Sequence, residues 1–256
     1  MLMRLIVAIT VLIAASFVIA DEQHFPIEVA IIIDDLGYSR ERGLAALDLP
    51  GDVTFAVIPH SPNARFLATQ AQERDKEIIL HAPMSNVHDY PIGELGLNDS
   101  MDEEAFNEAL TEAIASVPYI RGVNNHMGSL LTQQPVPMKW MMSTLEQQGL
   151  YFVDSRTTSR SIAWKTAQEH NVPSLKRDVF LDHEQETSFI HEQFEHFIAI
   201  AKRRGYAIAI AHPYPETLAY LQQNLSRLAA EGITLVPASH LVYAHSPNRQ
   251  QIQAKM

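Results

Sequence analysis

Short apolar runs alternate with amphipathic segments along the chain from residue 29 onward. The runs are rich in Val, Ile and Ala, and several are apolar at consecutive positions, which is typical of strands buried on both faces. We predict strands at residues 29–35, 53–59, 77–83, 122–128, 150–155, 174–179, 206–212 and 233–238.

Between most of these runs, apolar residues recur every three or four positions, which indicates amphipathic helices. Some of their ends carry typical signals. Pro215 stands at a first helical position, Ser100 and Glu103 form a capping box, and Gly205 follows a helical segment. We predict helices at residues 62–74, 100–117, 135–148, 187–204 and 215–231.

Strands and helices that alternate in this way indicate an α/β protein with a parallel sheet. The chain of 256 residues has no linker-like tract rich in Pro, Gly or Ser, so we expect one domain over residues 21–244. A single (β/α) barrel of seven or eight mostly parallel strands is the favoured architecture. A doubly wound open sheet is the alternative.

Residues 1–20 have the pattern of a secretory signal peptide. Arg4 precedes a nearly continuous apolar run, and the simplest cleavage point lies between Ala20 and Asp21. An uncleaved membrane anchor is the alternative, but the run is shorter than the roughly 20 apolar residues that span a bilayer. We therefore expect a periplasmic or secreted protein with no stable membrane insertion after cleavage. We expect the polar segment 245–256 to be disordered.

Composition narrows the range of partners. The chain has no cysteine, so it forms no disulfide, and a bound metal would be held by His, Asp or Glu. Its formal net charge is -11, and removing Arg4, the only charged residue of the signal peptide, makes it -12. A negative protein is poorly suited to nucleic acid or anionic lipid, and we expect neither as a partner. The sequence leaves the oligomeric state open.

Polar side chains stand at or just beyond the ends of most predicted strands. They include Asp34, Asp35, His81, Asn124, Asn125, His126, Asp154, Arg156, Arg177 and His212. In barrels and in open parallel sheets, ligands bind where the carboxyl ends of the strands meet. A strand-end aspartate taken singly can equally be the cap of the next helix, and a single histidine can be a hydrogen-bonded structural residue. Their repeated position favours one shared site.

Two histidines and one aspartate from three strand ends match the ligands of a catalytic zinc ion, which has three protein ligands and one open position. A further carboxylate beside the metal would serve as a general base. These residue types therefore indicate a catalytic metal site, with Zn²⁺ or another divalent cation as cofactor.

Six motifs occur in order along the chain: IIIDDLG, EIILHAPM, GVNNHMGS, YFVDSRT, RDVFLD and AIAHPYPETL. In this combination the chain resembles the divergent polysaccharide deacetylase family, a branch of the NodB-like carbohydrate esterases. The resemblance extends from about Val29 to about Val242. It implies a distorted (β/α) barrel, often of seven strands, and metal-dependent hydrolysis of an N- or O-acetyl group on a polysaccharide.

The resemblance also implies roles for single residues. Asp34 matches the aspartate that acts as catalytic base, and Asp35 matches the aspartate that binds the metal. His81 matches the first metal histidine, but Ser85 stands where the broader family usually has the second. His126, at the end of the following strand, is the expected replacement.

His212 matches the histidine that acts as general acid, and Asp154 falls where an aspartate would orient it. The arginine that usually holds the base has no clear counterpart, and Arg156 and Arg177 are both candidates. The asparagines beside His126 could bind sugar hydroxyls or orient the ligand. The predicted substrate-binding residues are therefore Asn124, Asn125, Arg156 and Arg177.

Together with the signal peptide, the resemblance implies an exported metal-dependent hydrolase that removes acetyl groups from an acetylated polysaccharide or oligosaccharide. A glycan-binding protein of the same fold, with weak or no catalysis, is one alternative. A metal-dependent phosphoesterase is another. It would need two metals and more cationic strand ends than Arg156 and Arg177 provide.

Overall fold

The computed structural model of the chain describes residues 26–93 and 95–247. The predicted signal peptide, residues 1–20, and its cleavage point after Ala20 lie outside the described residues. Within the described ranges, none of the helices combines the length and apolar character of a membrane span.

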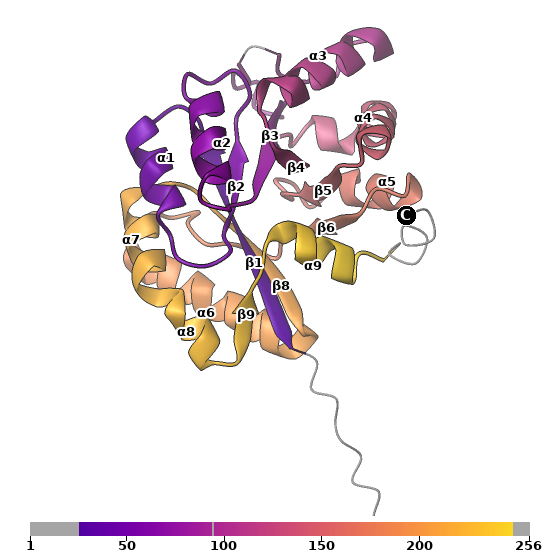
Figure 1. Ribbon diagram of the computed structural model, residues 1–256. Coiled ribbons are helices and arrows are strands. Elements are labelled where there is room, and N and C mark those ends of the chain that lie inside the picture. The colour runs from indigo at the N-terminus through magenta and orange to yellow at the C-terminus, as the bar shows by residue number, and fades with distance from the viewer. Residues whose placement is uncertain (1–25, 94, 248–256) are drawn as a thin grey trace, which may run out of the picture.

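In the described part of the chain, nine strands form one curled sheet (Figure 1). They are β1 (Ile27–Leu36), β2 (Thr54–Val57), β3 (Ile78–Met84), β4 (Ile120–Met127), β5 (Tyr151–Asp154), β6 (Ser174–Lys176), β7 (Val179–Phe180), β8 (Tyr206–Ala211) and β9 (Ile233–Leu235). Their pairings are parallel, in the order β6-β5-β4-β3-β2-β1-β8-β7, and β9 also pairs with β1. The strands β1 to β6 follow one another in order, and β8 lies on the other side of β1, as predicted for a (β/α) barrel and not for a doubly wound sheet.

The two strands at the ends of this order, β6 and β7, follow one another directly in the chain. The predicted strand 174–179 is split, because β6 pairs with β5 whereas β7 pairs with β8. Arg177 and Asp178 lie between the two short strands, and their backbone N–H groups donate to Asp154 O and Ile208 O, both at 2.9 Å. The barrel is therefore distorted, with a seam between β6 and β7.

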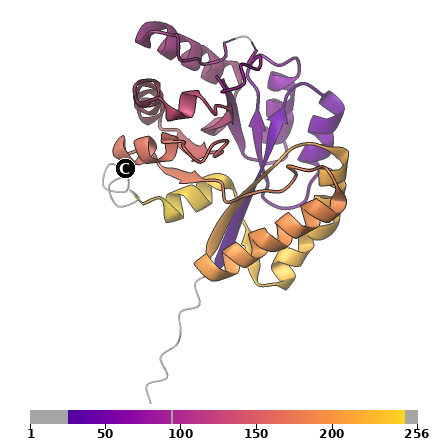
Figure 2. The ribbon, with the colours of Figure 1, turned by 180° about the vertical axis from the view of Figure 1, so that it is seen from behind.

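Helices cover the outside of the barrel, and the long α6 lies along β8 and β1 (Figure 2). The helices are α1 (Arg40–Leu47), α2 (Ala64–Gln72), α3 (Glu103–Ser116), α4 (Pro135–Gln148), α5 (Ala163–Glu169), α6 (Thr187–Arg204), α7 (Pro215–Asn224), α8 (Ser226–Ala230) and α9 (Ala238–His245), with a 3₁₀ turn at Leu131–Gln133. The five predicted helical segments match α2, α3, α4, α6 and the pair α7 and α8. Sequence patterns missed α1, α5 and α9, since seven or eight residues are too few to establish a helical period.

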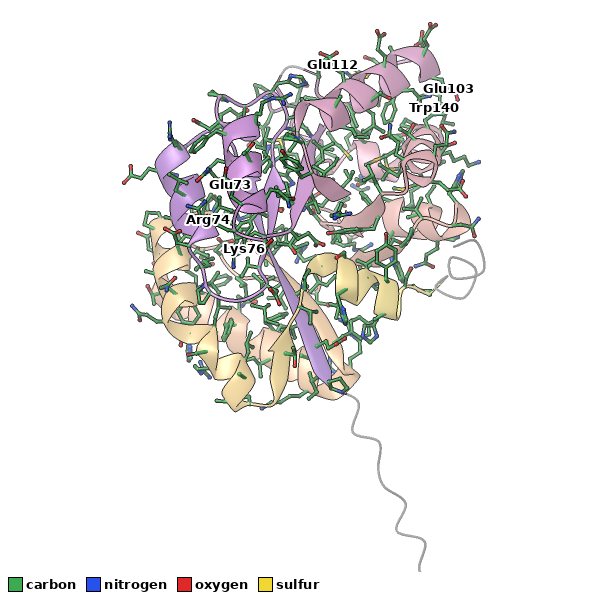
Figure 3. The ribbon with its side chains drawn as sticks, viewed as in Figure 1. Glu73, Arg74, Lys76, Glu103, Glu112 and Trp140 are labelled. Carbon is green, nitrogen blue, oxygen red and sulfur yellow. The ribbon has the colours of Figure 1, made fainter. Side chains whose placement is uncertain are left out.

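The start of α3 differs from the predicted capping box. Asp102 is the N-cap, and its carboxylate accepts a hydrogen bond from Ala105 N at 2.9 Å. Ser100 instead donates its hydroxyl to Asn98. Figure 3 shows Glu103 and Glu112 of α3, and both are exposed to solvent.

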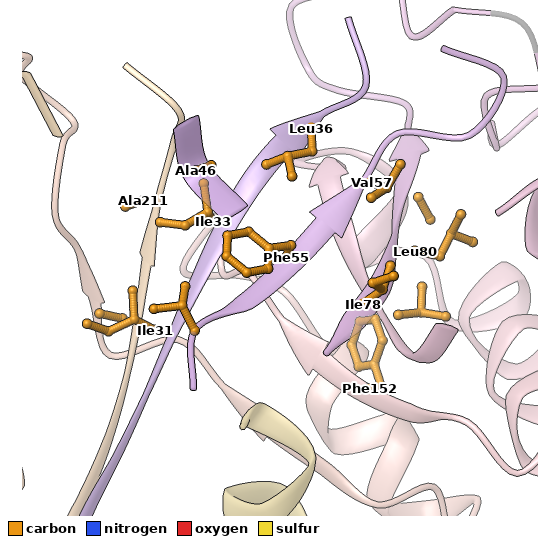
Figure 4. Close-up of a cluster of buried hydrophobic side chains, with 14 of the residues drawn as sticks. Ile31, Ile33, Leu36, Ala46, Phe55, Val57, Ile78, Leu80, Phe152 and Ala211 are labelled. Atoms are coloured by element: carbon orange, nitrogen blue, oxygen red, sulfur yellow. The ribbon is translucent and has the colours of Figure 1, made fainter. Parts of the chain in front are cut away.

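Alternate strand residues face two different cores. In β1, Ile31 and Ile33 belong to the larger core between the sheet and the helices, which Figure 4 shows together with Phe55. Ala30 and Ile32 belong to the smaller core inside the barrel. This alternation follows from the pleat of a strand, and it also decides which strand-end polar residues face the barrel interior.

Helix α9 closes the barrel at the end where the strands begin. Leu241 and Val242 are fully buried in the interior core. Beyond them, His245 is the last residue of α9, and Ser246 is buried and accepts a hydrogen bond from Ser174 N at 3.0 Å. The expectation of a disordered tail from residue 245 is therefore wrong for its first two residues.

Candidate active site and metal centre

Four polar side chains converge at the open mouth of the barrel because they share the interior face of their strands. Asp34 lies two residues after the interior residue Ile32, so its side chain points to the same face of β1. By the same alternation, His81 and Asn124 point into the barrel from the ends of β3 and β4. His212 follows β8 at the same parity as the interior residues of that strand. Asp34, His81 and Asn124 are each at most 2% exposed.

Asp35 joins this group by breaking the alternation. A regular strand would turn its carboxylate away from that of Asp34. Instead, Asp35 adopts a left-handed conformation with φ of 59°, and the register of the β1–β2 pairing shifts between Ile33 and Leu36. Such a conformation costs on the order of 1–3 kcal/mol and persists where the surroundings enforce it. The carboxylate of Asp35 is thereby brought to the histidines.

Gly37 allows the chain to make this turn. Its φ is 132°, which favours glycine, and an added Cβ would lie 1.8 Å from Ser61 Oγ. The backbone after β1 therefore packs closely against the chain after β2. This packing supports the position of Asp35 two residues earlier.

Asp35, His81 and His126 present three potential ligand atoms to one another. Asp35 Oδ1 lies 2.9 Å from His126 Nδ1 and 3.2 Å from His81 Nε2, and the two ring nitrogens are 3.2 Å apart. Ligand atoms about 2.0–2.1 Å from a tetrahedral zinc ion are separated by about 3.3 Å. The three atoms therefore fit one face of a tetrahedral site for a divalent cation.

Asn124 fixes the tautomer of His81. Its amide nitrogen donates to Asp34 Oδ1 at 2.8 Å, so its amide oxygen is the acceptor 2.7 Å from His81 Nδ1. His81 Nδ1 therefore carries the proton, and in the neutral ring Nε2 has a lone pair that points toward Asp35. A metal-binding histidine is typically held in this way by a partner of its other nitrogen.

The contacts of Asp35 could be hydrogen bonds from protonated imidazoles or lone pairs directed at a cation. Asp35 Oδ1 is a buried atom without a hydrogen-bond partner among the described residues, and this favours lone pairs directed at a cation. Burial alone would raise the pKa of Asp35, but the adjacent His126 and His81 outweigh it and hold that pKa well below its usual value. Asp35 is therefore ionised, as a metal ligand must be.

Asp34 has the environment of a general base. Burial raises the pKa of Asp34 above its usual value, against the opposing charges of His81 and His212. One carboxylate oxygen accepts from Asn124, and the other, Oδ2, lies 3.6 Å from His81 Nε2. Asp34 thus stands beside the three potential ligands, with one oxygen facing them.

His212 is paired with Asp182, a residue that sequence reasoning missed. His212 Nδ1 lies 2.9 Å from Asp182 Oδ1, and the other oxygen of Asp182 accepts from His212 N and from Thr217 Oγ1. Burial alone would lower the pKa of His212, but the hydrogen bond and charge of Asp182 outweigh it and raise that pKa to about 9. His212 Nε2 faces the cluster, 4.0 Å from Asp35 Oδ2.

The prediction that Asp154 orients His212 is therefore wrong. Asp154 has the same parity as Phe152 of the outer core, so its side chain lies on the helix-facing side of β5. Its carboxylate accepts from Ser161 Oγ at 2.8 Å and from Trp164 N at 3.3 Å, near the start of α5. It is a structural residue, and the final Asp of the RDVFLD motif was the available signal for Asp182.

The prediction that both asparagines bind substrate is also wrong, because neither is exposed at all. Asn124 orients His81, which was the other role considered for it. Asn125 faces the opposite side of β4, where it accepts from Ser155 N at 2.9 Å and donates to Met127 O at 2.8 Å.

Arg156 and Arg177 are both bonded to backbone carbonyls. Arg156 donates to Ser161 O and Ser159 O at 3.2 and 3.1 Å. Arg177 donates to the carbonyls of Ser155 and Arg156 at 2.6 and 2.9 Å. These bonds hold both guanidinium groups in place and favour structural or electrostatic roles over direct substrate binding.

Arg177 is the better candidate for the arginine that acts on the base. Burial lowers the pKa of Arg177 to about 10, although the charges of Asp154 and Asp34 oppose this effect. Arg177 therefore stays positive at neutral pH and its charge acts on Asp34. Its guanidinium also stacks on Phe180, 3.7 Å from the ring centre, and Phe180 stacks in turn on His212.

Within the described residues, Asp35, His81 and His126 are the one group of three such side chains close enough to hold a metal together. A phosphoesterase with two metals would need a second group. The arrangement therefore favours chemistry at a single cation.

The curled parallel sheet and the polar mouth define a NodB-like (β/α) barrel. Residues 31–242 match the family described as divergent polysaccharide deacetylase, and the chain belongs to this family. It is 39% identical over 215 residues to the "Uncharacterized protein YibQ" of Escherichia coli K12, covering 84% of this chain and 67% of that protein. It is 38% identical to an uncharacterized protein of Haemophilus influenzae, covering 84% of this chain and 76% of that one.

Solved structures share the fold. An uncharacterized protein of Agrobacterium tumefaciens C58, ATU2773, aligns with a TM-score of 0.81 at 25% identity, over 84% of this chain and 89% of that chain. BA3943 of Bacillus anthracis, described as a CE4 family pseudoenzyme, aligns with a TM-score of 0.53 at 13% identity, over 85% and 66%. The peptidoglycan deacetylase PdaC of Bacillus subtilis aligns at 0.52 and 14%, over 90% and 95%.

The ligand assignment predicts the metal content of two variants. His81→Ala and His126→Ala should each reduce the zinc content of the purified protein from about one equivalent to below about 0.2, because two remaining ligands bind zinc weakly. The exposed His183→Ala is the matched control and should keep the full amount. Elemental analysis measures the content, and full occupancy in both site variants would show that the assignment is wrong.

The hydrogen bond from His81 to Asn124 predicts an effect on zinc affinity. Asn124→Ala should weaken zinc binding by about 10- to 100-fold, because the ring of His81 loses the partner that fixes its tautomer. Asn125→Ala removes an equally buried amide on the other side of the strand and should leave the affinity within about twofold. Competition with a chelator measures both. Equal losses in the two variants would contradict this role for Asn124.

The pairing of His212 predicts a change in its titration. Because Asp182 raises the pKa of His212, Asp182→Asn should lower that pKa from about 9 to near or below 6.5. A histidine with a raised pKa keeps its proton until the pH exceeds that pKa, so the variant should lose the protonated form at lower pH. NMR titration of His212 measures this. Asp154→Asn is the control. A lowered pKa of His212 in that variant alone would show that Asp154, and not Asp182, is the partner of His212.

Proposed function

We propose that this chain is an exported, metal-dependent hydrolase that removes acetyl groups from a polysaccharide. The observation that carries the proposal is the grouping of Asp35, His81 and His126 between a buried carboxylate, Asp34, and a histidine, His212. This grouping provides one cation site with a base and an acid beside it. Membership of the divergent polysaccharide deacetylase family supports acetylated carbohydrate as the substrate.

Zinc is the cation that these ligands suit best. Two imidazole nitrogens and one carboxylate oxygen form a borderline donor set, and no thiolate is available because the chain has no cysteine. When bound, such a cation would polarise the acetyl carbonyl and lower the pKa of a water molecule toward about 7. The remaining positions around it would be open to substrate and water.

Asp34 would take the proton from the attacking water. Its raised pKa brings it closer to the neutral range in which a general base works well. Its bond to Asn124 occupies Oδ1 and leaves Oδ2 facing the cluster, so the oxygen that accepts the proton is fixed in position. The positive charge of Arg177 would keep the carboxylate available in its ionised form.

His212 would give a proton to the leaving amine or alkoxide. Asp182 holds Nδ1, so Nε2 is the donor, and the raised pKa keeps the ring protonated at neutral pH. His212 approaches the cluster at Asp35, whereas Asp34 approaches it at His81. Asp34 would therefore act on the attacking water from one side, and His212 would act on the leaving group from another. This division of roles is what acyl hydrolysis requires.

The location of the reaction follows from the predicted signal peptide. Residues 1–20 have the composition of a secretory leader, and we propose that the chain acts in the periplasm or outside the cell. Peptidoglycan or another acetylated glycan at that location is the proposed class of substrate.

The proposal predicts release of acetate. The zinc-loaded protein should release acetate from N-acetylated chito-oligosaccharides, and Asp34→Asn should lower kcat by about 10²- to 10⁴-fold, because it removes the base but no ligand. An acetate assay measures the rate, and elemental analysis checks that zinc content is unchanged in the variant.

A glycan-binding protein without catalysis is the second candidate function. It is favoured by the fold neighbour BA3943, which is described as a pseudoenzyme. In that case the zinc-loaded protein would bind the same oligosaccharides and release no acetate. An unchanged rate in Asp34→Asn would instead contradict the role of Asp34.

A further inference from the structure

A hollow of about 320 Å³ lies at the end of the barrel that holds the candidate metal centre, among residues at or beyond the carboxyl ends of β3, β4 and β5. Met127, the residue that follows the proposed ligand His126, forms part of its lining. Residues 86–90, after β3, form one wall, and residues 157–160, after β5, form the opposite wall. A glycan whose acetyl group reaches the cation would have its neighbouring sugar close to this hollow. The argument below therefore rests on the proposed function.

One wall of the hollow is held firmly by Asn86. This residue is 7% exposed, and its amide oxygen accepts hydrogen bonds from His88 N and Tyr90 N, both at 3.1 Å. Its amide nitrogen donates to Tyr90 O at 3.0 Å, and Ser129 Oγ accepts from Val87 N at 3.1 Å. The loop therefore presents its side chains from a fixed backbone, which reduces the entropy lost when a ligand binds.

The opposite wall is also tied to the metal-bearing strand. Thr157 Oγ1 donates to Met127 O at 2.8 Å, and Thr158 Oγ1 accepts from Arg160 N at 3.2 Å. Arg160 is exposed, and the described residues offer its guanidinium no ion pair. Its charge is consequently available to a ligand in the hollow.

The basic groups that line the hollow are Arg160 and His88, and none of its described lining residues is an Asp or Glu. Asp89 is next to His88 in the chain but does not line the hollow. In a chain with a net charge of -11 this is an unusual surface, and it attracts an anion to one place beside the site.

The other lining groups suit a sugar. The rings of His88 and Tyr90 lie 5.5 Å apart with a tilt of 37°, and Tyr90 is 61% exposed, so an aromatic surface is open to the apolar face of a pyranose ring. Hydroxyl groups of Ser129 and Thr158 line the same hollow and can bond sugar hydroxyls.

We propose that this hollow is a subsite for a sugar that carries a carboxylate, so that the preferred substrate is an acidic acetylated glycan. Arg160 pairs with the carboxylate, and Tyr90 contacts the ring of the same sugar. A guanidinium group matches the planar carboxylate through two parallel hydrogen bonds. One guanidinium suits one singly charged group, which favours a carboxylate over a phosphate dianion.

The test compares two ligands that differ in one functional group. The probes are tetrasaccharides of alternating N-acetylglucosamine and N-acetylmuramic acid, with the lactyl groups either as free carboxylates or as carboxamides. Binding is measured by calorimetry on the zinc-loaded full chain carrying Asp34→Asn, so that the probe is not consumed. The carboxylate form should bind at least about fivefold more tightly at low salt, and less so at high salt.

Arg160→Gln should remove this preference and bring the two dissociation constants within about twofold. Arg121→Gln is the matched control, since Arg121 is also exposed and lies at the other end of the barrel, in the first part of β4. The control should keep the preference. Equal binding of both probes, a preference that survives in Arg160→Gln, or binding of neither probe would overturn the subsite.

An acetate assay with the carboxamide probe separates this proposal from the proposed function. Acetate release by the protein with Asp34 intact, combined with no carboxylate preference, would reject the subsite alone. A clear carboxylate preference that depends on Arg160, without any acetate release, would support the subsite and reject the hydrolase.

Discussion

The candidate site depends on the rule that successive side chains of a strand point to opposite faces. Asp34, His81 and Asn124 come from strands far apart in the sequence, yet all three face the barrel interior because each stands next to a residue of the outer core in its strand. Asp35 is the exception that completes the group. Its left-handed backbone conformation brings a second carboxylate to the mouth from a position that a regular strand would direct toward the helices.

Two buried residues then set the orientation of the two histidines with proposed roles in the chemistry. Asn124 determines which nitrogen of His81 carries the proton, and Asp182 does the same for His212. The orientation of an imidazole decides whether it can bind a cation or deliver a proton. Both supporting residues are almost fully buried, so the surrounding core fixes their own positions.

Much of this arrangement follows from sequence. The apolar runs locate most of the strands, and polar residues at their ends predict that Asp35, His81 and His126 come together, while their role as ligands stays a prediction. The sequence predicts the wrong partner for His212 because a place at a strand end does not show which face a side chain takes, and the parity of Asp154 directs it toward the helices. Asp182 follows the short strand β7, and the split of 174–179 at the seam depends on pairing between distant segments, which local patterns do not encode.

The amide of Asn124 joins the proposed base to a proposed ligand by two hydrogen bonds, and this has a consequence for how the site tolerates change. Truncating the Asp34 side chain, unlike Asp34→Asn, which keeps an acceptor oxygen, leaves the amide nitrogen without its acceptor, and the loss passes on to the ring of His81. Effects of substitutions at these three positions are therefore coupled rather than additive. In evolution, a member of the family that loses the base gives up part of the constraint on its metal ligand as well, so loss of one function can be followed by drift in the other.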